Sequence, residues 1–162
     1  MTDALTRFLP DEAATLALGR ALAVGLQPGM VVYLVGDLGA GKTTLARGVL
    51  AGLGHAGKVK SPTFTLVEPY DLSRLYLYHF DFYRFGDRSE KGSHELHAFE
   101  DAGFRECFDG RSVCLIEWPE RAGNRLAPPD LTLNLALQDT GRSAAIAAQT
   151  EAGRECLEHL RP

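Results

Sequence analysis

The central motif of the chain is Gly36-Asp37-Leu38-Gly39-Ala40-Gly41-Lys42-Thr43-Thr44, which fits the phosphate-binding pattern G-x-x-x-x-G-K-[ST]. The glycines of such a loop let the backbone turn with its N–H groups pointing inward, so that the loop and the following helix N-terminus bind an anion. Lys42 is expected to reach the β- and γ-phosphates of a nucleotide, and the Thr43 hydroxyl to bind Mg²⁺. We therefore expect Asp37 to Thr44 to contact a nucleotide.

The residues on either side of this loop have the patterns that the motif requires. Before it stands the apolar run Val31-Val32-Tyr33-Leu34-Val35, preceded by Pro28-Gly29, which is typical of a strand buried on both faces. After it, residues 44–53 place Leu45, Val49, Leu50 and Leu53 on one helical stripe. The order strand, loop, helix predicts a P-loop nucleotide site.

The rest of the chain predicts a mixed α/β fold. We expect helices at 10–25, 94–108 and 150–160, a buried strand at 113–117, and hairpins formed by 64–70 with 75–81 and by 131–138 with 144–148. Residues 86–93 are polar and contain glycine, which favours an exposed excursion. The predicted fold is a three-layer, P-loop NTPase-like α/β sheet, parallel at its centre with antiparallel hairpins at its edges.

Composition favours a single soluble domain over residues 1–162. The chain has 162 residues, of which 45% are hydrophobic, enough for an ordinary core. A net charge of −4 argues against a broad cationic face for RNA or anionic lipid. Cys107, Cys114 and Cys156 are widely spaced, as expected of reduced, buried thiols. No run resembles a signal peptide or a membrane span, so we expect a cytoplasmic protein without membrane contact.

Two acidic residues end apolar strands and are candidates for the carboxylate that helps to hold the metal. Asp81 follows Leu77-Tyr78-His79-Phe80, and Glu117 follows Val113-Cys114-Leu115-Ile116. Hydrolysis of a phosphoanhydride needs one group to hold Mg²⁺ and another to orient the attacking water. The sequence leaves open which acid does which, and each could also simply mark the exit of a strand into solvent.

Several other residues have both a functional and a structural interpretation. Ser61-Pro62-Thr63 lies where nucleotide switches place a loop that senses the γ-phosphate, but it also reads as an ordinary Ser-Pro turn. Trp118 follows Glu117, although a lone tryptophan more often lies in a core or interface. His79 is expected on the strand face opposite Phe80, near the site or simply buried. His94 and His97 share a helical face but have no third zinc ligand at suitable spacing.

The sequence favours adenine over guanine only by an absence. A GTPase normally carries an Asn-Lys-x-Asp segment that reads guanine, and this chain has none. We therefore expect ATP, with Mg²⁺, as the bound nucleotide.

Four segments together resemble the TsaE family, also called YjeE, of bacterial P-loop ATPases that act in threonylcarbamoyladenosine biosynthesis in tRNA. They are the loop from Gly36 to Thr44, Lys60-Ser61-Pro62-Thr63-Phe64-Thr65-Leu66-Val67-Glu68-Pro69-Tyr70, His79-Phe80-Asp81-Phe82-Tyr83-Arg84 and Cys114-Leu115-Ile116-Glu117-Trp118-Pro119-Glu120. The last three are more diagnostic than the P-loop. Residues 86–93 look longer than the usual link in this family, and the tail after Pro128 matches only in its hairpin pattern.

The resemblance implies a Mg²⁺-dependent ATPase that is weak alone and activated by its partners, the TsaD and TsaB subunits of the tRNA-modifying complex. Contact with tRNA would be indirect, through that complex. Position by position, Lys42 and the loop amides would bind phosphates, Thr43 and Glu117 would be the Mg²⁺ ligands, and Asp81 would orient water. Glu12 lies where the family places adenine, and Trp118 with the Ser61-Pro62-Thr63 loop would sense the nucleotide or face a partner.

Two other function classes fit the same loop. A small-metabolite kinase would need arginines on a lid to clamp the transferred phosphoryl group, and Arg84, Arg88 and Arg105 are scattered over a region without a clear lid. A scaffold that does not hydrolyse ATP would use the nucleotide only to set the shape of a docking surface.

Overall fold

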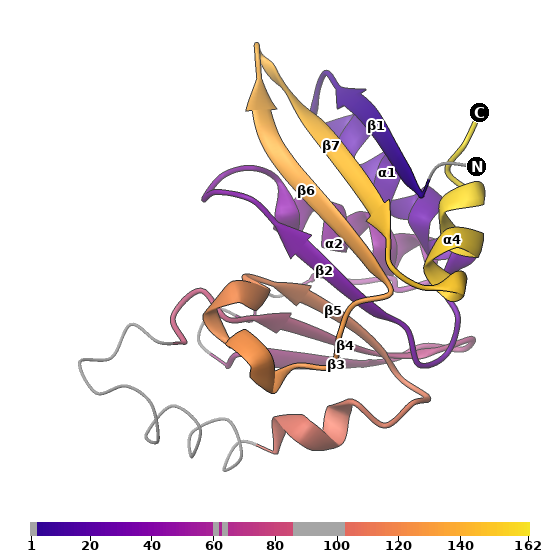
Figure 1. The fold of residues 1–162 in the computed structure, drawn as a ribbon, viewed down its shortest axis with the longest axis vertical. Coiled ribbons are helices and arrows are strands. Elements are labelled where there is room, and N and C mark those ends of the chain that lie inside the picture. The colour runs from indigo at the N-terminus through magenta and orange to yellow at the C-terminus, as the bar shows by residue number, and fades with distance from the viewer. Residues whose placement is uncertain (1–2, 60–61, 63–64, 86–102) are drawn as a thin grey trace.

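A computed structural model describes residues 3–59, 62, 65–85 and 103–162 of the chain. Its centre is a seven-stranded sheet in the order β1-β7-β6-β2-β5-β4-β3 (Figure 1). The strands are β1 Ala4–Leu9, β2 Val31–Val35, β3 Val67–Asp71, β4 Tyr76–Asp81, β5 Val113–Glu117, β6 Leu131–Gln138 and β7 Gly141–Ala148. The α-helices of the described residues are α1 Glu12–Gly25, α2 Lys42–Gly52 and α4 Glu151–Glu158, and short 3₁₀ helices cover Phe104–Cys107, Pro119–Arg121 and Gly123–Arg125.

The sheet has the predicted parallel centre and antiparallel edges. β2 pairs in parallel with β5 and β6, and β4 pairs in parallel with β5. The hairpins β3–β4 and β6–β7 are antiparallel, as is the pairing of β1 with β7. Because β2, β4 and β5 run in the same direction, their carboxyl ends meet at one edge of the sheet, where α/β folds place their ligands.

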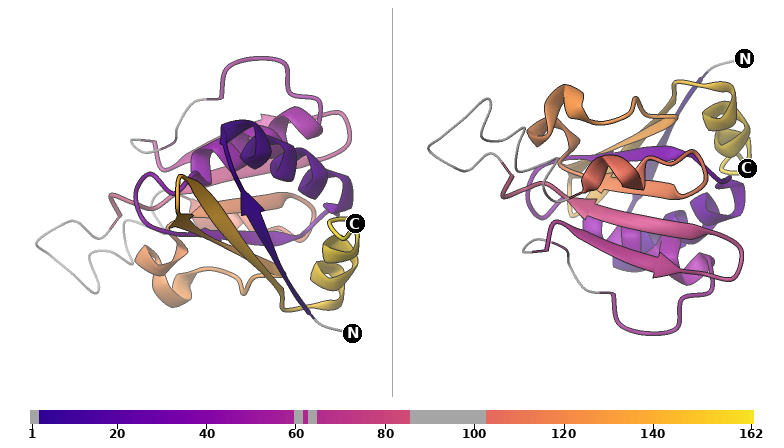
Figure 2. Two further views of the ribbon diagram at one scale, coloured as in Figure 1. Left: turned by 90° about the horizontal axis from the view of Figure 1, so that it is seen from above. Right: turned by 90° about the horizontal axis from the view of Figure 1, so that it is seen from below.

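Two hydrophobic clusters lie on opposite faces of the sheet. Along β5, Val113 and Leu115 belong to the cluster that includes α1, α2 and α4, whereas Cys114 and Ile116 belong to the other. This alternation follows from the two-residue period of a strand. The second face is covered by aromatic side chains such as Phe80 and Phe104, and by the 3₁₀ turns, which lie opposite α1 and α2 in Figure 2.

Helices α1 and α2 pack closely because glycines face each other between them. A Cβ atom added at Gly19 would stand 2.4 Å from the carbonyl oxygen of Leu45, and one at Gly48 would stand 2.3 Å from that of Leu16. Both positions are buried. The absence of side chains there lets α2, which begins at the P-loop, rest directly on α1.

Side chains that accept hydrogen bonds from backbone N–H groups define where two helices begin. Asp11 caps α1 by accepting from the Ala14 N–H at 2.9 Å. Thr150 caps α4 by accepting from the Gly153 N–H at 3.1 Å, and its own hydroxyl donates to Asp130 at 2.7 Å. Such caps satisfy backbone N–H groups that have no partner within the helix.

The structure differs from the sequence-based prediction mainly at the N-terminus. Residues 4–9 form the edge strand β1, which was not predicted. Only Leu9 of its six residues is buried, so the apolar pattern of this strand is weak. Of the helix predicted at 94–108, the described part is the 3₁₀ turn Phe104–Cys107; the rest, with residues 86–93, lies outside the described residues. The helices of the described residues are too short or too polar to cross a membrane.

Candidate functional site

The P-loop connects the end of β2 to the start of α2 at the carboxyl edge of the parallel strands. Gly41, which caps α2, has a φ of 107°, a value that side-chain-bearing residues rarely adopt. This conformation turns the chain into the helix with the first N–H groups of α2 exposed toward the loop. A helix N-terminus of this kind favours a bound anion.

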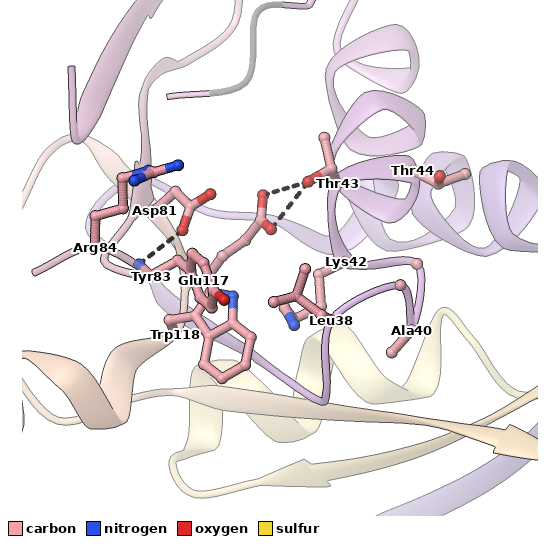
Figure 3. A pocket seen from close by; sticks show the side chains of 12 residues that line it. Leu38, Ala40, Lys42, Thr43, Thr44, Asp81, Tyr83, Arg84, Glu117 and Trp118 are labelled. Atoms are coloured by element: carbon pink, nitrogen blue, oxygen red, sulfur yellow. Dashed lines mark hydrogen bonds between the residues drawn. The ribbon is translucent and has the colours of Figure 1, made fainter. Parts of the chain in front are cut away.

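A cavity of about 430 Å³ lies over the P-loop (Figure 3). It is bounded by the P-loop on one side and by the ends of β4 and β5 on the other. Its lining residues are Leu38, Gly39, Ala40, Gly41, Lys42, Thr43, Thr44, Asp81, Tyr83, Arg84, Glu117 and Trp118. Of the loop residues predicted to contact nucleotide, Asp37 lies outside this lining and borders a neighbouring groove with Leu38 and Glu120.

Glu117 is the acid that meets the P-loop. The Thr43 hydroxyl lies 3.0 Å from Glu117 Oε1 and 3.1 Å from Oε2, and donates to this carboxylate (Figure 3). Glu117 ends β5, which lies next to β2 in the sheet, and its side chain is almost completely buried. The two side chains stand 74 residues apart in the sequence, so only the folded chain brings them together.

Asp81 stands beside Glu117 but has different contacts. The two residues are register partners on the parallel strands β4 and β5. Asp81 Oδ1 accepts a 2.9 Å hydrogen bond from the Tyr83 N–H, and the Asp81 N–H donates to Leu66 O at 3.0 Å. Both acids therefore line the cavity, and Glu117 is the one that also bonds to Thr43.

Lys42 is buried at the base of the cavity. Its ammonium group donates to the carbonyl oxygens of Gly36 and Asp37, the latter at 3.1 Å, and stands 4.0 Å from the centre of the Trp118 ring. Burial lowers the pKa of Lys42, while nearby carboxylates, chiefly Glu117, oppose this shift. The carbonyl oxygens of Gly36 and Asp37 thus hold the Lys42 ammonium group at the bottom of the cavity.

Trp118 belongs to the cavity wall. The residue has a φ of 57°, a left-handed conformation that is uncommon for side chains of this size. This backbone places the indole over Lys42 and 5.0 Å from the Tyr83 ring, between centroids. Backbone conformations of this kind concentrate at functional sites.

His79 lies behind Glu117 and is fully buried. Its Nε2 atom is 2.7 Å from Glu117 Oε2. The carboxylate accepts this hydrogen bond, so Nε2 carries the hydrogen. The sequence left open whether His79 lies near the site or is simply buried. In the structure it is buried and also contacts Glu117 of the cavity wall.

A second, smaller cavity of about 260 Å³ adjoins the P-loop where α1 begins. Glu12 and Thr15 line it, together with Gly39, Gly41 and Thr44 of the loop, and so does Arg142 of β7. Arg142 also donates to Gly39 O at 3.0 Å. Glu12 therefore shares a cavity with Gly39, Gly41 and Thr44 of the P-loop.

The predicted and observed site residues differ in two ways. Ser61, Thr63, His94 and His97 lie outside the described residues. Pro62 is buried, and its carbonyl oxygen accepts from the Leu66 N–H at 2.6 Å. Four residues that line the two cavities had no predicted role in the site: Tyr83, Arg84, Thr15 and Arg142. Tyr83 and Arg84 could have been predicted to line the cavity, because they follow closely after Asp81 in the sequence. Arg142 lies far from the other site residues in the sequence, so no local pattern points to it.

The oxygen atoms at the base of the cavity are of the kind that Mg²⁺ takes. Among the described residues, His, Cys, Asp and Glu side chains form no group of three or more that could hold a metal ion. Mg²⁺ does not need such a group, because it commonly keeps several waters and takes one or two protein oxygens together with phosphate oxygens. Thr43 Oγ1 and the Glu117 carboxylate are hard oxygen donors that lie together where the start of α2 meets the end of β5, which matches that requirement.

Comparison with known proteins agrees with this geometry. A sequence model of the family described as "Threonylcarbamoyl adenosine biosynthesis protein TsaE" matches residues 9–145. The chain is similar to the tRNA threonylcarbamoyladenosine biosynthesis protein TsaE of Haemophilus influenzae, with 42% identity over 96% of each chain, and to that of Bacillus subtilis, with 40% identity over 82% of this chain and 75% of the other. The crystal structure of Bacillus subtilis YdiB superposes with a TM-score of 0.78 at 31% identity, covering 99% of this chain and 97% of that one.

Proposed function

The chain belongs to the TsaE family of threonylcarbamoyl adenosine biosynthesis proteins, and from this premise we propose that it is a Mg²⁺-dependent ATPase that supports threonylcarbamoyladenosine modification of tRNA. The observation that carries the proposal is the contact of Thr43 with Glu117 at the base of a P-loop cavity that Asp81 also lines. We further propose that residues 1–162 act as one ATPase domain in the cytoplasm.

Each residue in the cavity has a role in this proposal. Lys42 exchanges loop carbonyl oxygens for phosphate oxygens, and the loop N–H groups bind the remaining phosphate charge. Thr43 and Glu117 hold Mg²⁺, which neutralises charge on the β- and γ-phosphates when it is bound. Asp81, which stands beside Glu117 without bonding to Thr43, orients the attacking water. The adenine occupies the cavity lined by Glu12.

The proposed activity depends on protein partners. We propose that the chain hydrolyses ATP slowly by itself and faster in association with TsaB and TsaD, and that it approaches tRNA only through that complex. Its net charge of −4 supports indirect contact with tRNA, because direct binding to the phosphate backbone normally uses a cationic surface.

The test compares ATP hydrolysis by the chain alone with hydrolysis in the presence of purified TsaB and TsaD. We expect stimulation by the partners, and loss of hydrolysis in Lys42→Ala, which removes the phosphate-binding cation. Nucleotide binding can be followed separately by the fluorescence of Trp118, the single tryptophan, which contacts Lys42 in the cavity. Rapid turnover without partners, or no association with them, would contradict the proposal. A phosphorylated metabolite formed from labelled ATP in a cell extract would favour a kinase instead.

A further inference from the structure

His79 has a position that packing alone does not explain. It lies on β4 between Leu77 and Asp81, with which it shares a strand face by the two-residue period. Its side chain is completely buried, and Leu77 on the same face belongs to the hydrophobic cluster around α1 and α2. An aliphatic side chain would suit a position of this kind, yet the chain has an imidazole there.

The hydrogen bonds of the imidazole show what it contributes. Nε2 donates to Glu117 Oε2 at 2.7 Å, whereas the buried Nδ1 atom has no hydrogen-bond partner among the described residues. Burying a polar atom without a partner is unfavourable. An imidazole at this position therefore carries the unfavourable free energy of burying Nδ1 without a partner. What it provides in return is the hydrogen bond from Nε2 to the Glu117 carboxylate.

Glu117 is a side chain whose orientation needs support. Its carboxylate rotates about three single bonds, and ligand oxygens must be held in place if a metal is to find them ready. In this structure the carboxylate is held from two directions, by the Thr43 hydroxyl from α2 and by His79 Nε2 from β4. Removing a group that hydrogen-bonds to a metal-binding side chain typically lowers the affinity for the metal 10- to 100-fold.

We propose that His79 is a positioning residue: its Nε2–H bond holds the Glu117 carboxylate facing Thr43, so that the site is arranged for Mg²⁺ before the nucleotide arrives. The inference rests on the proposed function, since it assumes that Thr43 and Glu117 bind the metal. It goes further by assigning a role to a buried residue that does not line the cavity.

The test uses two substitutions that each introduce a side-chain amide N–H, at a different distance from the backbone. The side-chain nitrogen of His79→Gln can replace Nε2, whereas that of His79→Asn lies nearer the position of Nδ1 and falls short of Glu117. His55→Gln is the matched control, because His55 contacts Tyr70 and the Lys58 carbonyl and lines neither the P-loop cavity nor the Glu12 cavity. The probe is a non-hydrolysable ATP analogue, whose dissociation constant is measured with excess chelator and over a Mg²⁺ titration.

We expect His79→Asn to bind the analogue normally in chelator but to lose about 10-fold or more of the affinity that Mg²⁺ adds. The Mg²⁺ concentration that gives half-maximal binding should rise in proportion. His79→Gln should keep most of the Mg²⁺ effect, and His55→Gln all of it. Thermal melting of each variant shows whether it is folded.

Three results would overturn the inference. If His79→Asn kept the full Mg²⁺ effect, the hydrogen bond would not position the ligand. If both variants lost affinity equally with and without Mg²⁺, or if His79→Gln failed to fold, His79 would be a residue of the hydrophobic core. If the natural protein bound the analogue with no enhancement by Mg²⁺, the assignment of Thr43 and Glu117 to the metal would fail, and the proposed function with it.

Discussion

At the scale of single residues, the two acids that the sequence could not tell apart differ in their contacts. Thr43 and His79 both hydrogen-bond to the Glu117 carboxylate, whereas Asp81 Oδ1 accepts from a backbone N–H two residues further along the chain. Glu117, next to the Thr43 hydroxyl, is suited to binding the metal. Asp81, at the end of the neighbouring strand, is suited to orienting the attacking water. The two acids should therefore respond differently to neutralisation.

We predict that Glu117→Gln and Asp81→Asn separate metal binding from hydrolysis. Glu117→Gln removes the anionic ligand, so Mg²⁺-dependent affinity for a non-hydrolysable ATP analogue should fall together with a loss of hydrolysis of about 10²- to 10³-fold. Asp81→Asn should slow hydrolysis while leaving the Mg²⁺ effect on binding largely unchanged. Equal loss of Mg²⁺-dependent affinity in both variants would contradict these assignments.

Alanine at the same positions tests whether hydrolysis is needed at all. Asp81→Ala and Glu117→Ala are each added to a reconstituted complex, and tRNA modification is followed over many cycles. Modification should stop after few cycles if hydrolysis drives turnover. Continued cycling without hydrolysis would favour a scaffold whose docking surface is set by ATP alone.

At the scale of elements, the position of α2 depends on its contact with α1. Gly48 of α2 stands against the Leu16 carbonyl and Gly19 of α1, with no room for a methyl group. Because α2 begins at the P-loop, any displacement that opens this contact also moves Lys42 and Thr43. The distance between the two helices therefore affects both the stability of the protein and the position of the P-loop.

We predict that Gly48→Ala lowers the free energy of unfolding by about 1–3 kcal/mol, because the added Cβ would lie 2.3 Å from the Leu16 carbonyl oxygen. Urea denaturation of the purified protein measures this difference. Gly57→Ala is the control: an added Cβ there would meet only His55 ring atoms, at 3.6 Å or more, so its effect should stay within about 0.5 kcal/mol. Similar losses in both variants would show that helix packing is not the cause.

At the scale of the whole molecule, the three cysteines report on how well the core excludes water. All three are free and buried. Burial raises the pKa of Cys107 to about 11 and that of Cys156 to about 12, and it raises the pKa of Cys114 further. Their ordinary value is 9.0, so above that pH the unfolded chain loses protons that the folded chain retains. Lys42 acts in the opposite direction, because its pKa is lowered by burial.

We therefore predict that the protein loses stability as pH rises from 9 toward 11. Each thiol that stays protonated in the folded state contributes up to about 1.4 kcal/mol per pH unit in this range. Urea denaturation at several pH values should show the decline, and Cys156→Ala should reduce it by about 2 kcal/mol between pH 9 and 11. An unchanged pH slope in this variant would mean that the Cys156 thiol is exposed to solvent in the folded protein.

Features encoded in short segments of the chain could be predicted from the amino-acid sequence. The P-loop between a buried strand and a helix, the two hairpins, the strand at Val113–Glu117 and the two strand-end acids all follow from local periodicity and turn residues, and the structure contains each of them. That Asp81 and Glu117 lie side by side was not predicted, because it depends on the parallel pairing of β4 with β5.

Contacts between distant segments could not be predicted and are seen only in the folded chain. The pairing of β1 with β7, the bond between Thr43 and Glu117, the stacking of Trp118 on Lys42 and the contact of His79 with Glu117 join residues 38 or more positions apart in the chain. No local pattern specifies such contacts, since they depend on strand order, register and the direction of each side chain once the sheet has formed. The sequence thus predicted a phosphate site with two candidate acids, and the fold selected the acid that meets Thr43.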